Sequence, residues 1–256
     1  MRLSFPAGMV DIPFKPYPPR PETCLSFYPR DTEVVEYTHG GKTISNCRAA
    51  LFGKHSVVTN RYVGRDFMLV QVVFQPNGLY RLTGIPAFEF TNTYLDAETI
   101  FDKEIRAVNE RLSSAADFRE MLRIVEVYLT QLAAQSRKEF HPIDAVSSLM
   151  LNAPEKISLD WLAKESFLSP KQFERKFVER VGINPKYFAR IIRFDRAFRL
   201  KNAQPHRDWF GIAIECGYYD YQHLVKDYKE FTNFSPNAFY LQEAKAPERH
   251  FGIRET

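Results

Sequence analysis

Two stretches of the chain, SPKQFERKFVERVGINPKYFA (Ser169–Ala189) and DYQHLVKDYKEFTNFSPNAFY (Asp220–Tyr240), align without a gap at a shift of 51 residues. Apolar positions fall on apolar positions and basic ones on basic ones. Each copy follows a short apolar segment, LDWLAKES in the first and DWFGIAIEC in the second. A repeated unit of this size is a duplicated supersecondary motif. Two copies are too few for a solenoid, and they fit a duplicated helix-turn-helix.

Both copies begin with a helix-capping residue. Ser169 and Asp220 are good N-caps because their side-chain oxygens accept from free N–H groups of the first turn. Pro170 suits the first helical position. At 3.6 residues per turn, one face of each helix is apolar. The residues that we expect to face inward are Phe173, Phe177, Leu224, Tyr228 and Phe231.

The opposite faces combine cationic and hydrogen-bonding side chains. In the major groove, Arg or Lys reads guanine, Gln reads adenine, an acidic group reads cytosine, and an apolar group meets the thymine methyl. A single polar helix face is usually only solvated, but the duplication favours DNA contact. The expected outward residues are Lys171, Glu174, Arg175 and Val178 in the first copy and Gln222, Val225, Lys226 and Lys229 in the second.

The segment between the two copies predicts their spacing. Pro185–Leu200 has apolar residues on a helical stripe, and its sixteen residues would span roughly 24 Å. With the width of each unit added, two reading helices would lie about one DNA turn apart, roughly 34 Å. The region 155–245 holds 16 Lys and Arg against 12 Asp and Glu, while the rest of the chain balances. The positive excess therefore lies where a polyanion would bind.

These residues resemble the AraC/XylS family of transcription regulators. The resemblance covers about 90 residues: LAKESFLSPKQFERKFVERVGINPKYF, the linker RFDRAFRL, and IAIECGYYDYQHLVKDYKEFTNFSP. It implies two helix-turn-helix units joined by a long helix, bound to double-stranded promoter DNA, with RNA polymerase recruited or hindered. Base-reading residues are expected among Lys171, Glu174, Arg175, Gln222, Val225 and Lys226. Glu174 departs from the family, in which a neutral or basic reader is more usual, so it either reads cytosine or pairs with its neighbours.

The first part of the chain predicts short strands followed by helices. Five segments are rich in β-branched and aromatic residues and end at turn residues: TCLSFYP, TEVVEYT, RAALFG, SVVTNRYV and DFMLVQVVFQ. ETIFDKEIRAVNERL and DFREMLRIVEVYLTQLAAQ then show helical spacing. We predict an α+β, two-domain protein: an antiparallel, cupin-like sandwich or barrel with helices at 1–140, an all-α DNA-binding domain at 141–245, and a C-terminal tail at 246–256.

The role of the N-terminal domain is left open by the sequence. A closed or half-closed sheet could hold a small-molecule effector, or the same interior could be filled by Phe67, Leu69, Val72 and Phe74. The domain could instead bind a protein or form a homodimer. Leu122, Val125, Leu129 and Leu132 form a short seam of the coiled-coil type, for which packing on its own domain is the simpler reading.

Several other classes of function are not indicated. The family's His-x-His metal pattern is absent and the histidines are dispersed, so we expect neither metal nor cofactor. HGGKT at His39–Thr43 lacks the first glycine of a phosphate-binding loop and reads as a hairpin turn. No catalytic motif occurs, so we do not expect an enzyme; one with a fused helical domain is the alternative. Three scattered cysteines and no long apolar stretch predict a cytoplasmic protein without membrane contact.

Overall fold

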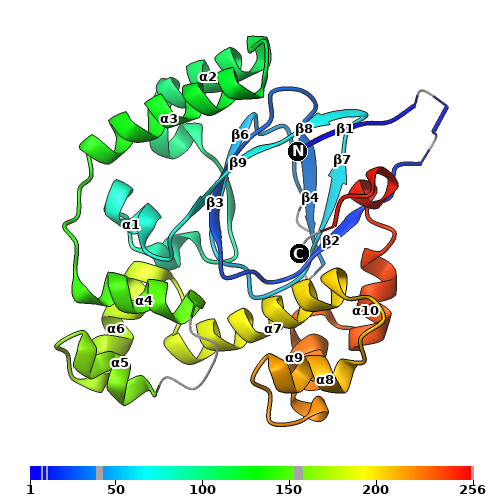
Figure 1. Cartoon of the computed structure of the whole chain (residues 1–256). Helices are drawn as coiled ribbons and strands as arrows, with labels where there is room; N and C mark the ends of the chain where they lie inside the picture. Colours follow the sequence, from blue (N-terminus) through cyan, green and yellow to red (C-terminus); the bar gives the residue numbers. More distant parts are fainter. Residues whose placement is uncertain (7, 10, 39–42, 153–157, 255–256) are drawn as a thin grey trace.

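The computed structural model describes residues 1–6, 8–9, 11–38, 43–152 and 158–254. Figure 1 shows three parts: paired helices above, strands in the centre, and a group of helices below that is threaded by the long helix α7. The hairpin turn expected at His39–Thr43 falls largely outside the described residues.

The strands form two four-stranded antiparallel sheets and a two-stranded ribbon. Their orders are β10-β6-β3-β9, β2-β7-β4-β5 and β1-β8. The bounds are β1 Arg2–Ser4, β2 Lys15–Tyr17, β3 Thr23–Phe27, β4 Glu33–Tyr37, β5 Thr43–Ile44, β6 Ala49–Phe52, β7 Thr59–Val63, β8 Asp66–Met68, β9 Val70–Phe74 and β10 Tyr94–Asp96.

Alternation along the strands divides the side chains between two apolar layers. In β3, Cys24 faces the second sheet, while Leu25 and Phe27 face the helices, as the period of two requires. In β6, Ala50 and Phe52 face the second sheet, whereas Ala49 and Leu51 face the helices. The sheet that contains β3 therefore lies between the other sheet and the helices α2 and α3.

The helices follow in two groups. The first, with α1 Gly78–Thr83, η1 Ala87–Phe90, α2 Glu98–Ser114 and α3 Phe118–Ala134, covers the sheet. The second comprises α4 Pro142–Asn152, α5 Leu159–Glu165, α6 Pro170–Val181, α7 Pro185–Ala203, α8 Trp209–Glu215, α9 Tyr221–Thr232, α10 Pro236–Glu243 and η2 Pro247–Phe251.

The predicted fold class and its main elements are confirmed. All five expected strand segments contain strands, and the last divides at Leu69 into β8 and β9. The two expected helices are α2 and α3, and the repeat forms α5–α6 and α8–α9. Three of the four seam residues, Val125, Leu129 and Leu132, pack on their own domain's core, while Leu122 is exposed.

The expected filling of the sheet interior is wrong in part. Phe67 is buried between the sheets, but Val72 and Phe74 pack on the helix side. The reason is register: in β9 the even-numbered residues face α2 and α3, so Gln71 and Val73 point the other way. Space therefore remains on that side of β9.

The two halves of the molecule are joined by buried polar contacts. Arg20, before β3, donates from Nη1 to Asp195 Oδ1 of α7 at 2.7 Å, and both side chains are buried. Arg199, one turn further along α7, pairs with Glu22 at 2.7 Å. The segment after α10 also returns to the first half, where Glu248 pairs with Lys15 and Phe251 packs edge-on against Phe5. The expected tail is thus part of the packed structure up to this point.

Candidate nucleic-acid interface

Local sequence fixes the start of the first recognition helix, α6. Ser169 and Gln172 form a capping box, in which each side chain accepts from the other residue's backbone N–H. Pro170 occupies the first helical position, and Gly182 ends the helix with a φ of 100°. Phe173 and Phe177 are buried beneath it, as expected.

The second recognition helix, α9, is built in the same way with different residues. Asp220 accepts at Oδ1 from the backbone N–H of His223 at 2.8 Å, and this bond holds the pKa of Asp220 below its usual value. Asn233 closes the other end in the left-handed conformation. Leu224, Tyr228 and Phe231 are buried, so the predicted inward face is correct.

The predicted outward faces lie at the surface. Val225 and Val178 are half-buried, and the other predicted side chains are exposed. Within the described residues, no hydrogen bond or ion pair holds these exposed side chains, and Glu174 does not pair with a neighbour. They are available to a ligand that offers both acceptors and donors. The exposed set is Lys171, Glu174, Arg175, Gln222, Lys226 and Lys229.

A buried ion pair fixes the first unit against helix α4. Arg180, near the end of α6, donates to both oxygens of Asp144 at 2.6 Å. Burial raises the pKa of Asp144, but the hydrogen bonds from Arg180, Asn77 and the His141 backbone, with the Arg180 charge, together hold the pKa low. The Arg180 guanidinium also stacks on Tyr80 of the N-terminal half, and Tyr80 donates to Glu179 at 2.8 Å. The reading end of α6 remains open because these contacts lie at its other end.

The second unit is held by arginines of α7. Arg190 donates to Asp227 at 2.7 Å and to Glu230 at 2.6 Å, both on α9. Arg193 lies over the ring of Tyr218, whose hydroxyl donates to the buried carboxylate of Asp227. Burial raises the pKa of Tyr218, so this hydroxyl remains a donor. These contacts orient α9 on α7 with its basic face outward.

Helix α7 sets the distance between the units. It spans 19 residues, or about 28 Å, and Figure 1 shows α4 to α6 at one end and α8 to α10 at the other. The recognition of two successive turns of one DNA face would need a separation of this order between α6 and α9.

Some exposed residues beside the reading faces were not predicted. The His223 imidazole bonds through Nδ1 to Asp220 at 2.8 Å and leaves its other edge at the surface. Phe167 and Tyr219 stand out in the two turns. At the 51-residue shift His223 aligns with Gln172, and this alignment is the sequence feature from which its exposed position could have been predicted. The two aromatic residues lie outside the helical period, so periodicity could not place them.

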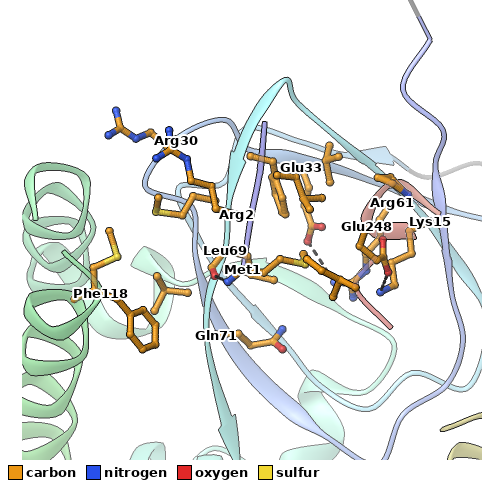
Figure 2. Close-up of a pocket in the computed structure, with 18 of the residues that line it drawn as sticks. Met1, Arg2, Lys15, Arg30, Glu33, Arg61, Leu69, Gln71, Phe118 and Glu248 are labelled. Atoms are coloured by element: carbon orange, nitrogen blue, oxygen red, sulfur yellow. Dashed lines mark hydrogen bonds and ion pairs between the residues drawn. The ribbon is translucent and has the colours of Figure 1, made fainter. Parts of the chain in front are cut away.

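The N-terminal half contains a cavity of about 980 Å³. Figure 2 shows Phe118 of α3 on one side, Met1 and Leu69 in the centre, and Lys15, Arg61 and Glu248 on the other. Arg199 of α7 also lines it, so both halves of the molecule contribute. The apolar part is formed by Met1, Leu3, Leu69, Phe118, Met121 and Leu122.

The polar end of the cavity holds paired charges. Arg61 donates to Glu33 at 3.3 Å and lies between the rings of Tyr17 and Phe52. Its Nε and Nη2 are buried and have no hydrogen-bond partner in the described structure. Burial also lowers the pKa of Lys15, which Glu248 partly offsets. One end is therefore apolar and the other strongly polar.

The described residues contain no group of three or more His, Cys, Asp or Glu side chains placed to hold a metal ion. Nor does any described helix have the length and hydropathy needed to span a bilayer. The three cysteines are free and buried, and burial raises the pKa of Cys216 to about 11.

Comparisons with known proteins agree with this architecture. Residues 162–242 match the model of a helix-turn-helix domain family. No curated protein matches the sequence. A structure of ToxT from Vibrio cholerae superimposes with a TM-score of 0.51 at 10% identity, covering 94% of this chain and 96% of that one. Wild-type ToxT bound to an unsaturated fatty acid gives 0.51 at 12%, with 94% and 93% covered. An AraC-type regulator from Chromobacterium violaceum is 27% identical over 40% of this chain and 92% of its own, with a TM-score of 0.35.

The fold and the duplicated motif define a two-domain protein with a DNA-binding helix-turn-helix region. Residues 162–242 are a helix-turn-helix domain of the AraC type, and this region is the DNA-binding part of the chain. Over nearly its whole length the chain shares the fold of ToxT.

Proposed function

We propose that this protein regulates a promoter by inserting α6 and α9 into successive major-groove turns of double-stranded DNA. The observation that carries the proposal is the pair of capped, outward-facing helices fixed at the two ends of α7. In this assignment the domains are 1–140 and 141–245, and RNA polymerase is the partner whose access changes. The proposed DNA-binding residues are Lys171, Glu174, Arg175, Gln222, Val225, Lys226 and Lys229.

Substitution of one reader in each unit tests this assignment. Arg175→Ala and Lys226→Ala should each cost about 1–3 kcal/mol of binding free energy and relax preference at their own base pairs. The measurement is fluorescence anisotropy of the full chain on DNA from upstream of its own gene, with each base pair varied in turn. Lys186, exposed at the start of α7 and outside both reading faces, supplies the control variant Lys186→Ala. Equal weakening on all sequences would mean that Arg175 and Lys226 touch only phosphate.

The cavity is the proposed effector site. Its apolar part and its charged end favour a small amphipathic ligand, and its lining includes α7, the helix that spaces the two units. The fatty acid bound in ToxT is amphipathic in this sense, and that supports the choice. A ligand that touches Arg199 and the N-terminal strands together would change how firmly α7 is held, and through it the DNA affinity.

A ligand screen separates effector binding from a purely dimeric role. Long-chain unsaturated acids should raise the melting temperature of the wild-type protein, because a ligand that binds only the folded state adds RT ln(1 + [L]/Kd). Val63→Trp, which puts a large ring into the cavity lining, should abolish that rise. If no amphipathic compound stabilises the protein while sedimentation finds a stable dimer, the N-terminal domain acts by association instead.

A further inference from the structure

Each helix-turn-helix turn exposes one aromatic ring. Phe167, between α5 and α6, is 86% exposed, and Tyr219, between α8 and α9, is 88% exposed. No other large apolar or aromatic side chain of the described residues is as exposed. Single exposed apolar side chains are common on protein surfaces, but here each of the two turns carries one.

Backbone strain accompanies the ring of Phe167. Its φ is +56°, in the left-handed region, where a bulky side chain is disfavoured. The other non-glycine residues with positive φ in the described chain are Asn46, Asn92 and Asn233. Asparagine tolerates this region because its short side chain bonds locally. Phe167 is therefore the exception, and a strained residue that persists at an exposed turn indicates a role beyond the fold.

The strain occurs in the first unit only, because the residue after the C-cap of the first helix is Phe167 there and Gly217 in the second unit. The second turn has three residues between Cys216 and Asp220, so Gly217 takes the positive φ while Tyr219 carries the exposed ring. The first turn has two residues between its caps. In this shorter turn, Phe167 both adopts the left-handed backbone conformation and carries the exposed ring. Both units keep an exposed ring despite this difference.

Packing within the protein does not account for either ring. The described aromatic contacts leave Phe167 without a ring partner and give Tyr219 only the edge of His223, with centroids 6.0 Å apart. Phe167 also lies outside the apolar clusters of the described structure, whereas its neighbour Leu168 packs against the core.

Exposed basic side chains occur in the sequence near both rings, together with the acidic Glu165 and Asp220. Phe167 is between the exposed Lys164 and Lys171, and Tyr219 precedes His223 and Lys226. A polyanion with apolar surface of its own satisfies both features, and duplex DNA offers deoxyribose faces beside its phosphates. We propose that Phe167 and Tyr219 pack on the sugar–phosphate backbone where α6 and α9 enter the groove. This rests on the proposed DNA binding and adds an apolar contact to each half-site.

Replacement by asparagine removes the ring and allows the backbone to keep its conformation. Phe167→Asn and Tyr219→Asn should each weaken DNA binding by the full chain about tenfold, and the double variant about a hundredfold. The dependence of affinity on salt should not change, because an apolar contact releases no counterion, whereas loss of a lysine that neutralises a phosphate lowers that slope by about 1. Phe167→Tyr should keep wild-type affinity. Leu241→Ala, at an exposed position of α10, is the control.

Stability and transcription measurements separate the remaining explanations. Phe167→Asn should melt at the wild-type temperature or above it, because strain is relieved and little packing is lost. Unchanged DNA affinity in both asparagine variants would overturn the proposal, and if transcription by RNA polymerase then fell, the rings would be a protein-docking surface. If Arg175→Ala also had no effect on affinity, the proposed DNA binding itself would fail; loss in Arg175→Ala alone would leave it standing.

Discussion

Lys54 is a buried cation at the contact between the two halves. Its side chain donates to Thr23 Oγ1 at 3.1 Å and to the Pro76 carbonyl at 3.4 Å, and it lies over the ring of Phe188 on α7. Within the described structure it has no salt-bridge partner. Burial lowers the pKa of Lys54 to about 7. The ammonium group is therefore close to losing its proton under ordinary conditions.

This lysine should make stability depend on pH. Between pH 7 and its unfolded value near 10.5, the unfolded chain holds a proton at Lys54 that the folded chain has lost. The free energy of unfolding therefore rises with pH in this range, by about 1.5 kcal/mol from pH 7 to about 8.5. Lys54→Met removes the group, so the pH dependence should be flatter by that amount in urea unfolding. Parallel profiles for the two proteins would show that Lys54 stays charged in the fold.

At the scale of elements, Gly182 is a point where the N-terminal half lies close to the end of helix α6. It ends α6 with a φ of 100°, and its carbonyl accepts from Thr91 Oγ1 at 2.9 Å. A Cβ at this position would lie 2.9 Å from the Ala87 carbonyl oxygen of η1. The backbone conformation and the neighbouring element both require glycine here.

Gly182→Ala should therefore destabilise the protein and loosen η1 from α6. We expect a loss of about 2–3 kcal/mol, from backbone strain and the clash together. Gly252→Ala is the matched control, because Gly252 also has a positive φ but a Cβ there would meet nothing within 4 Å. It should cost about 1 kcal/mol. Equal urea midpoints for the two variants would show that η1 moves to make room for the added Cβ at no cost in the free energy of unfolding.

Elements defined by local rules could be predicted, and those defined by distant contacts could not. The caps Ser169 and Asp220 and the buried Phe173 and Leu224 follow from helix period and capping, which act within a few residues. Strand β1 could not be predicted, because its three residues form a strand only by pairing with a distant segment, as Leu3 does with Phe67.

The residues that line the cavity could not be predicted from the sequence either. The cavity combines β1, β9, the start of α3, one side chain of α7 and the segment after α10, and no local pattern joins these. The outward faces of α6 and α9 could be predicted in position, but the exposed rings of Phe167 and Tyr219 could not, since a turn carries no periodicity. Glu248 was expected in a tail, yet it is buried against Lys15.

At the scale of the whole molecule, the N-terminal half holds the DNA-binding half at several points. Its hydrogen bonds reach α6 through Tyr80, α7 through Arg20 and Glu22, and the segment after α10 through Lys15. A change in the cavity, which shares Lys15, Arg20 and Glu22, can therefore act on the spacing of the two units. This is the physical route by which the proposed effector would change the proposed DNA affinity.

The most direct test of the central claim is hydroxyl-radical footprinting of the full chain on DNA from upstream of its own gene, repeated at increasing salt. We predict two protected segments on one face of the duplex, about 10 base pairs apart, with affinity that falls steeply as salt rises. Arg175→Ala should weaken one segment and Lys226→Ala the other. Binding that is insensitive to salt, or a single protected segment that neither variant alters, would contradict reading by two helices.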